Sequence, residues 1–356
     1  MTTMDGLRTF DSLPAGFLEA DPAGLQALLG GPSLIFLPGE RTPELFVSVL
    51  LHGNEHTGLR AIQQVLRRHA GRALPRALAL FVGNVAAARH GLRRLDGQPD
   101  YNRIWPGSVE PEGPERTLAR GVTAVMRERG VFACVDVHNN TGLNPHYGCV
   151  SRLDSPTLQL AALFSRTAVY FRTPPGVLSG AFAEFAPAIA VECGKPGEPA
   201  NDARAAGYLE ACLHLSEIPS HPVAAHDLSL YHTVCTVRVP DAMAMAFEPE
   251  QAALTLDAGL DHLNFTDLPA GHRLGRVTGV APGAAPPLQA TDERGRDVSL
   301  VYFSTDPQGV IRLARPATPA MLTLDLRVVR QDCLCYLMER MAPGAPTGEA
   351  VKEASA

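Results

Sequence analysis

The stretch LFVSVLLHGNEHTGLRAIQQVLRRHA, residues 45–70, joins an apolar run to a helical pattern through a short turn. The run is apolar apart from Ser48 and rich in valine, which favours a buried β-strand. From Leu59 onward the apolar residues recur at helical spacing, with arginine and glutamine on the other side, which predicts an amphipathic helix over Gly58 to Ala70. A strand that leads directly into a helix is the unit from which α/β sheets are built.

The same alternation continues through the first two hundred residues. We predict strands over Ser33–Leu37, Leu45–Leu51, Leu78–Val82, Val131–Val137, Ala168–Arg172 and Ala188–Val191, and further helices over Pro114–Arg129 and Asn201–Leu215. Several of these strands are apolar on both faces, which is typical of central strands covered by helices. The sequence therefore predicts an α/β fold with a mostly parallel mixed sheet flanked by helices.

After about Pro219 the sequence changes to short alternating runs separated by glycine, proline and threonine. Strands over His232–Val239, Asp297–Phe303 and Met321–Val329 would give a smaller, mainly β domain. The closing residues are small, polar and proline-containing, and we expect a disordered tail there. The predicted division is an α/β domain that carries the active site at 1–219, a β domain at 220–341 and a tail at 342–356.

Composition and charge narrow the classes of function. The chain has 356 residues and a net charge of -6, so it carries no basic surplus of the kind that binds nucleic acid or an anionic membrane. The N-terminus lacks a basic region followed by an apolar run, and no apolar stretch is long enough to cross a bilayer. We expect a cytoplasmic protein that acts on a small molecule or peptide, and the sequence leaves assembly into a homo-oligomer open.

Two histidines stand where predicted strands end. His52 follows the strand at 45–51, and Glu55 lies three residues later, in the turn that opens the helix. His138 ends the strand that begins at Val131. Because ligands bind at the carboxyl edge of open α/β sheets, we expect these three side chains to converge. Two imidazoles and a carboxylate are typical ligands of zinc, so the sequence predicts a zinc site.

Two further acids lie at the same predicted edge. Asp136 shares a strand face with His138, which makes it a candidate to orient that imidazole from behind. Glu192 ends a third strand. A catalytic zinc keeps three protein ligands and an open position for water, so we predict that Glu192 is the general base. Each residue alone also fits an ordinary structural role, and their shared position at strand ends favours the site.

Four short motifs in this order resemble the succinylglutamate desuccinylase/aspartoacylase family, which is related to the zinc carboxypeptidases. They are H-G-N-E-x-x-G at 52–58, D-x-N-R at 100–103, D-x-H-N at 136–139 and V-E-x-G at 191–194. The resemblance covers about residues 45–200. The remainder is similar to the family's small C-terminal domain only in its β-rich sequence pattern. It implies a zinc carboxypeptidase-like fold and one zinc ion per chain.

The resemblance also implies roles for residues that spacing alone does not single out. Asn102 and Arg103 would bind a substrate carboxylate, which suits the planar, two-pronged guanidinium. An arginine a few residues earlier steadies the developing oxyanion in this family, and Arg93 is the nearest match, with Arg94 as the alternative. The metal ligands and the base would be those predicted from the strand ends, with His52, Glu55 and His138 on zinc.

Three functions are compatible with these residues. The motifs favour a deacylase that cleaves the amide bond of an N-acyl amino acid. A zinc carboxypeptidase acting on peptides is the first alternative, and a non-catalytic metal-binding protein on the same fold is the second. Aspartoacylases carry a substrate-binding arginine about ten residues before the base, whereas Leu178–Ala183 contains none and Arg172 is the closest, so the resemblance leaves acyl-aspartate specificity open. Tyr302 and Tyr336 are candidates for a C-terminal tyrosine that seats aspartate.

Overall fold

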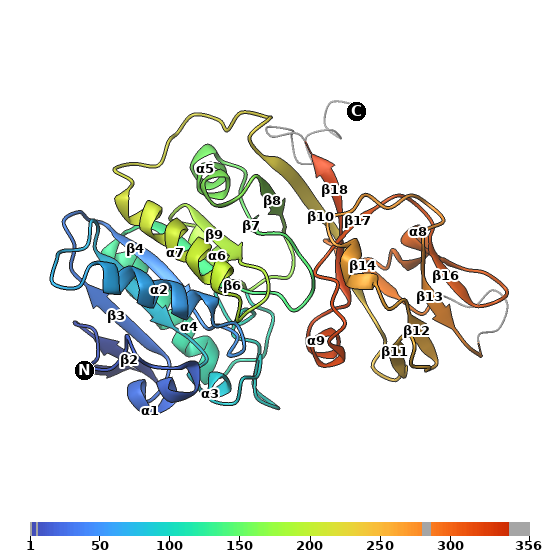
Figure 1. Ribbon diagram of the computed structural model, residues 1–356, viewed down its shortest axis with the longest axis horizontal. Helices are drawn as coiled ribbons and strands as arrows, with labels where there is room; N and C mark the ends of the chain where they lie inside the picture. The colour runs from blue at the N-terminus through green and yellow to red at the C-terminus, as the bar shows by residue number, and fades with distance from the viewer. Residues whose placement is uncertain (1, 5, 280–285, 342–356) are drawn as a thin grey trace.

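The computed structural model describes residues 2–4, 6–279 and 286–341. An α/β part that begins at the N-terminus stands beside a β-rich part formed by the last third of the chain (Figure 1). Long strands reach from one part into the other. The predicted tail at 342–356 lies outside the described residues. Within the described part of the chain, no helix is long and apolar enough to cross a membrane.

One large mixed sheet runs through the molecule. Its main strands follow the order β1-β2-β3-β5-β4-β6-β9-β7-β8-β10-β18-β17. The central neighbours β5, β4, β6 and β9 are parallel, as are β7, β8 and β10. This arrangement confirms the predicted α/β class with a mostly parallel mixed sheet. The strands are β1 (Thr2–Met4), β2 (Leu7–Phe10), β3 (Ser33–Leu37), β4 (Glu44–Val49), β5 (Leu78–Val82), β6 (Val131–His138), β7 (Tyr147–Val150), β8 (Thr167–Tyr170), β9 (Ala188–Glu192), β10 (Ser229–Arg238), β17 (Thr318–Ala320) and β18 (Cys335–Met341).

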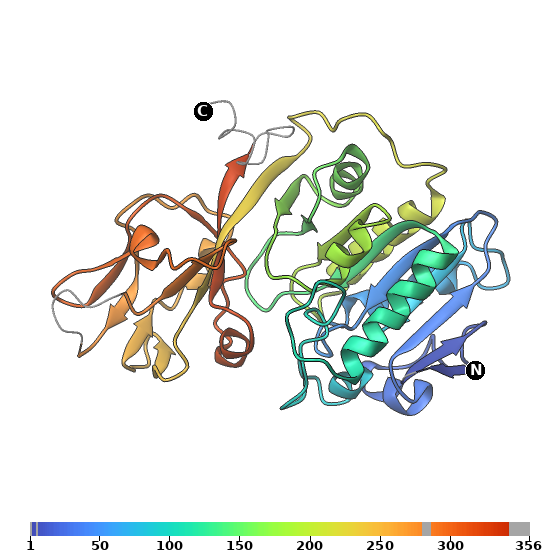
Figure 2. The same cartoon turned by 180° about the vertical axis from the view of Figure 1, so that it is seen from behind.

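Helices cover both faces of the α/β part. Two long helices pack together on the face toward the viewer in Figure 1, namely α2 (Thr57–Arg68) and α7 (Pro199–His214). The opposite face carries α4 (Pro114–Arg129), which lies in front in Figure 2. The shorter helices are α1 (Leu25–Leu29), α3 (Val85–Ala88), α5 (Ser155–Phe164) and α6 (Leu178–Ala183). Central strands such as β4 and β5 are buried along their whole length, as their apolar sequence predicts.

The C-terminal part adds a second sheet with its own core. This sheet has the order β11-β12-β13-β16-β15 and packs its apolar side chains into a separate cluster. Its strands are β11 (Met245–Phe247), β12 (Leu254–Leu256), β13 (Arg273–Val277), β16 (Val310–Leu313) and β15 (Phe303–Thr305), and β14 (Gln289–Asp292) pairs with β10. Because β10 and β18 extend the sheet of the α/β part, the division at residue 219 stays a proposal.

Two of the strands predicted in the C-terminal part are wrong. Much of Asp297–Phe303 forms α8 (Ser299–Tyr302), and α9 (Leu326–Gln331) replaces the strand expected over Met321–Val329. In both places an aspartate side chain accepts a hydrogen bond from the backbone N–H two residues later, Asp297 from Ser299 and Asp325 from Arg327. Asp325 is the N-cap of α9, whereas Asp297 lies one residue before the N-cap of α8, Val298. Such local side-chain hydrogen bonds to the backbone favour a helical turn and override the alternating pattern.

Candidate active site

The turn between β4 and α2 brings His52 and Glu55 to the carboxyl edge of the sheet. Leu50 takes a left-handed backbone conformation (φ 57°), which bends the chain at the end of the strand. Gly53 then passes so close to the backbone of Ala88 that a Cβ atom would lie 2.2 Å from its nitrogen. The Nδ1 atom of His52 donates to Oε1 of Glu55 at 2.8 Å.

His138 reaches the same point from the neighbouring strand β6. Its Nδ1 atom donates to the other carboxylate oxygen of Glu55 at 2.9 Å, so Glu55 lies between the two imidazoles. All three side chains are buried, and their donor atoms are close enough together to hold one metal ion. The structure therefore brings together the three residues that the sequence predicts as ligands. A second group that meets the same distance criterion, His69, Glu210 and His214, lies between α2 and α7 and is partly exposed.

The second nitrogen of each imidazole faces another carboxylate. Nε2 of His138 donates to Asp136 at 2.7 Å, the contact expected from strand alternation. Nε2 of His52 donates to Oδ1 of Asp100 at 2.9 Å. With Nε2 held in this way, Nδ1, which faces Glu55 in both rings, is the nitrogen that would bind a metal once it has lost its proton. Sequence reasoning assigned no role to Asp100, because it lies in a loop and not at a strand end, although the D-x-N-R motif begins with it.

The charges of the cluster stabilise each other. Burial works to raise the pKa of Glu55, but His52 and His138 outweigh it and lower that pKa below its ordinary value. Burial works to lower the pKa of His138, but Asp136 and Glu55 raise it well above the usual range. The pKa of His52 is raised in the same way by Glu55 and Asp100, against burial and the charge of Arg93. A buried pair of imidazoles with one carboxylate fits the ligand set of a divalent transition metal.

Glu192 lies beside this cluster without joining it. Its strand β9 pairs with β6 so that Glu192 is the register partner of His138. The side chain is buried, lines the same cavity and accepts a hydrogen bond from Nδ2 of Asn140 at 3.1 Å. Burial, aided by the charge of Glu55, raises its pKa to about 7, while His138 works in the other direction. A carboxylate with such a pKa can both take up and release a proton near neutral pH.

Arg93 is buried next to Glu55 and Asp100. Its Nε and Nη2 atoms donate to Oδ2 of Asp100 at 3.3 and 2.9 Å, and Nη1 lies 3.5 Å from Glu55. Arg94 instead donates to the backbone oxygen of Gln98 at 2.7 Å, and it does not line this cavity. Of the two arginines left open by the sequence, Arg93 is the one that the structure places at the cavity.

Asn102 and Arg103 line the cavity as well. Oδ1 of Asn102 accepts a hydrogen bond from the backbone of Leu178 at 3.1 Å, and Nη1 of Arg103 donates to the backbone oxygen of Asn102 at 2.8 Å. The remaining end of the Arg103 guanidinium donates to Asp332 at 3.1 Å. Asp332 comes from the C-terminal part, directly after α9, and no sequence signal pointed to it.

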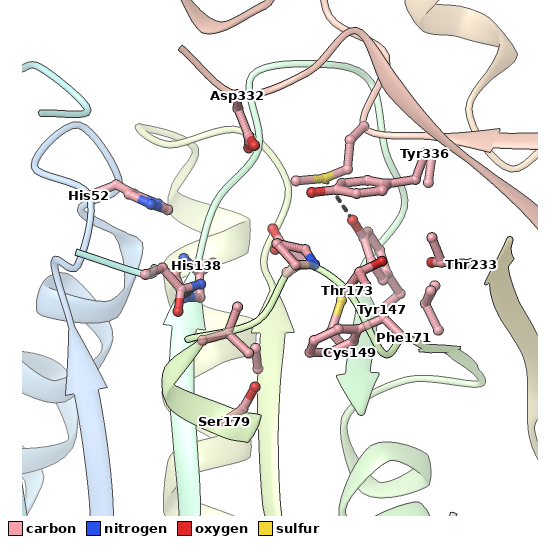
Figure 3. Close-up of a pocket in the computed structure, with 18 of the residues that line it drawn as sticks. His52, His138, Tyr147, Cys149, Phe171, Thr173, Ser179, Thr233, Asp332 and Tyr336 are labelled. Atoms are coloured by element: carbon pink, nitrogen blue, oxygen red, sulfur yellow. Dashed lines mark hydrogen bonds between the residues drawn. The ribbon is translucent and has the colours of Figure 1, made fainter. Parts of the chain in front are cut away.

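The cavity of about 100 Å³ extends from the histidines toward the C-terminal part. Figure 3 shows His52, His138 and Asp332 at one end and Tyr147, Cys149, Phe171 and Thr233 at the other. The far end is mainly apolar and is lined in part by residues of β17, β18 and the segment between α9 and β17. These lining residues are Ala320, Met321, Tyr336 and Met338. Tyr336 thus faces the cavity, whereas the other candidate tyrosine, Tyr302, packs in the core of the second sheet.

Comparisons with known proteins bear on the family and on the fold. Residues 41–203 match the family model of the succinylglutamate desuccinylase/aspartoacylase catalytic domain. No curated protein gives a significant match.

Solved structures with a similar fold cover both parts of the chain. Murine aminoacylase 3 has 15% sequence identity and a TM-score of 0.57, over 85% of this chain and 97% of its own. A succinylglutamate desuccinylase from Chromobacterium violaceum has 16% identity and a TM-score of 0.51, over 84% and 85%. A succinylglutamate desuccinylase/aspartoacylase from Rhodobacter sphaeroides has 18% identity and a TM-score of 0.53, over 86% and 88%. The family model matched at residues 41–203 is that of the family that the four motifs resemble, so the resemblance seen in the sequence is confirmed over this part of the chain.

Proposed function

We propose that this protein is a zinc-dependent amidohydrolase that removes the acyl group from an N-acyl amino acid. The observation that carries the proposal is the arrangement of His52, Glu55 and His138 in one cavity with the buried carboxyl group of Glu192. The family match and the fold of the similar structures support the reaction class.

His52, Glu55 and His138 would hold the metal, with Asp100 and Asp136 keeping the imidazoles in place. Zinc bound there would act as a Lewis acid that lowers the pKa of water to about 7. Glu192 takes the proton from the attacking water and passes it to the leaving nitrogen, which its pKa of about 7 allows. Both proton transfers therefore use Glu192, which is already buried beside the ligand group.

Arg93 has one edge left for the developing oxyanion. Nε and Nη2 are taken up by Asp100 and Asp332, whereas Nη1 makes only the long contact of 3.5 Å to Glu55. A buried guanidinium edge stabilises negative charge more strongly than an exposed one would. Asn102 and Arg103 would bind the α-carboxylate of the leaving amino acid.

The apolar end of the cavity suggests the kind of acyl group. If the arginines hold the amino-acid side of the amide, the acyl group points toward Tyr147 and Phe171. Apart from the two histidines of the ligand group, Arg93 and Arg103 are the basic residues among the described residues that line the cavity. A succinyl or aspartyl carboxylate would find no cation at the apolar end, so we propose a short, uncharged acyl group.

The carboxypeptidase alternative is less well supported. Residues such as Met321 and Tyr336 from the C-terminal part line the cavity, and its volume of about 100 Å³ leaves little room for an extended peptide. The non-catalytic alternative gives no reason for a buried glutamate with a raised pKa beside the ligand group. A cytoplasmic location and a homo-oligomer stay predictions.

Metal analysis followed by a substrate panel tests the proposal. The purified protein should contain about one zinc per chain and hydrolyse N-acetyl amino acids faster than N-succinyl amino acids or dipeptides. Removal of the metal with a chelator should abolish the activity, and added zinc should restore it. Faster cleavage of peptides from their C-terminus would favour the carboxypeptidase, and absence of turnover on the whole panel by the zinc-loaded protein would favour the non-catalytic alternative.

A further inference from the structure

Asp332 connects the two arginines of the cavity across the boundary between the two parts of the molecule. One of its carboxylate oxygens accepts a hydrogen bond from Nη2 of Arg93 and the other from Nη2 of Arg103, each at 3.1 Å. Its side chain is only 11% exposed. A buried carboxylate paired with two guanidinium groups stays ionised, and Arg103 and Arg93 accordingly lower the pKa of Asp332, although burial works against them.

The two arginines depend on Asp332 to different degrees. Arg93 has further carboxylate partners in Asp100 and Glu55. For Arg103, Asp332 is the one carboxylate partner among the residues that the structure describes. Asp332 thus presents to Arg103 the same chemical group, in the same charged form, that the α-carboxylate of a substrate would present.

We infer that Asp332 determines specificity: it occupies the carboxylate position on Arg103, and it has to turn away before a substrate with a free carboxylate can bind there. This inference rests on the proposed function, because that function assigns Arg103 to the substrate carboxylate. It adds a competitor within the chain that weakens binding of charged leaving groups and leaves binding of uncharged ones unaffected.

The backbone around Asp332 is fixed, so the competition involves its side chain. The backbone N–H of Asp332 donates to Val328 at 2.9 Å, and its carbonyl oxygen accepts a hydrogen bond from Arg238 at 3.0 Å. The inferred step that frees Arg103 is therefore a rotation of the Asp332 side chain and not a movement of the surrounding chain.

The segment that leads to α9 is also tied to the α/β part. Thr141 donates to Thr323 at 2.8 Å, and Asn144 accepts from the backbone of Met321 at 3.0 Å. Gly142 lies so close to Leu322 that a Cβ atom would be 1.7 Å from its carbonyl oxygen. These contacts hold the C-terminal segment against the α/β part. The fold therefore fixes the position of the Asp332 backbone beside the cavity.

Binding measurements in a Glu192→Gln background test the inference without turnover. Calorimetry with the zinc-loaded proteins would compare N-acetyl-L-alanine with N-acetyl-L-alaninamide, which lacks the charge. Asp332→Asn should lower the Kd of N-acetylalanine by about tenfold or more, since a charge-assisted hydrogen bond no longer competes. The Kd of the amide should stay within about twofold, because it does not use the charge of Arg103. Asp332→Ala should shift the Kd of N-acetylalanine in the same direction.

A matched control separates this effect from a general change in charge. Asp96 is exposed and pairs with Arg327 of α9, the helix that directly precedes Asp332. Asp96→Asn therefore removes one negative charge near α9 and changes no salt bridge of Arg93 or Arg103. The Kd of N-acetylalanine should not change in this variant. The gain in the Asp332→Asn protein should disappear when Arg103→Ala is added, because the carboxylate then has no anchor.

Binding of acetate, compared with binding of uncharged acetamide, distinguishes failure of this inference from failure of the proposed function. Tighter binding of acetate to the Asp332→Asn protein, dependent on Arg103, supports the role of Asp332 even if the protein with Glu192 intact hydrolyses no N-acyl amino acid. In that case the proposed function fails and the inference stands. If neither acetate nor N-acetylalanine binds more tightly to the Asp332→Asn protein, Asp332 does not occupy a carboxylate site and the inference is overturned.

Discussion

The polar residues of the cavity form two groups, the imidazoles with Glu55 at one end and the arginines with Asp332 at the other, and the fold positions these two ends in different ways. The imidazole end comes from β4, β6 and the turn before α2, and the register of the sheet sets the distances between its residues. The arginine end comes from the loop around residues 93–103 and from Asp332, which lies more than two hundred residues later. Each histidine is held on both nitrogens within the α/β part, whereas Arg103 relies on the C-terminal part. Changes at the first end should therefore affect the metal, and changes at the second should affect substrate binding.

The largest expected effect is loss of the metal. His52→Ala, Glu55→Ala or His138→Ala should each remove zinc and activity, because the site loses one of three protein ligands. Metal content after dialysis and activity would be measured together, and His90→Ala, an exposed histidine, is the control. Retention of one zinc at wild-type affinity in any of the three variants would remove that residue from the ligand set.

Glu192→Gln should separate chemistry from metal binding. The amide has nearly the same size, and Glu192 is not one of the three grouped ligands, so zinc and fold should remain. Loss of a positioned proton-transfer group costs about 10²–10⁴-fold in kcat, and we expect the upper end. Glu44→Gln makes the same substitution at a buried glutamate at the start of β4 and should leave kcat unchanged. If Glu192→Gln removes zinc, Glu192 is a fourth ligand; if it keeps normal kcat, the base lies elsewhere.

The raised pKa of Glu192 should also appear in the stability of the metal-free protein. Burial raises that pKa from 4.5 to about 7 in the folded state, so its stabilising contribution is complete below pH 4.5 and is lost as the pH rises through 7. At about 1.4 kcal/mol per pH unit, the free energy of unfolding of the wild type should fall by about 3 kcal/mol relative to Glu192→Gln.

Denaturant unfolding of both metal-free proteins between pH 4 and pH 8 measures this difference. Because the comparison is between two proteins at each pH, the other titrating groups largely cancel. A difference that does not change with pH would mean that Glu192 ionises in the folded state as easily as in the unfolded chain.

The same contrast between the two ends explains how much the sequence could predict. His52, His138 and Glu192 could be found because each lies at the end of a buried apolar strand or in the turn that follows it, and parallel neighbours bring such ends together. The roles of Arg93 and Arg103 came only from the family resemblance, since a loop has no periodicity that fixes where a side chain points. Asp332 was missed because the segment before it alternates like a strand, while the cap at Asp325 makes it helical.

Asp100 belongs to both ends and allows the smallest and most discriminating test. It accepts hydrogen bonds from His52 and from Arg93, whereas Asp136 contacts His138 alone among these residues. Loss of a carboxylate behind a metal-bound histidine typically costs about 10–100-fold in metal affinity, so Asp100→Asn and Asp136→Asn should both weaken zinc binding by that amount. Asp100→Asn should also raise the KM of N-acetylalanine at saturating zinc, because Arg93 loses its closest partner and with it the position of its guanidinium. Asp136→Asn should leave that KM unchanged. Zinc titration followed by kinetics at saturating zinc would measure the two quantities separately. An equal KM in the two variants would show that the imidazole and arginine ends are not coupled through Asp100.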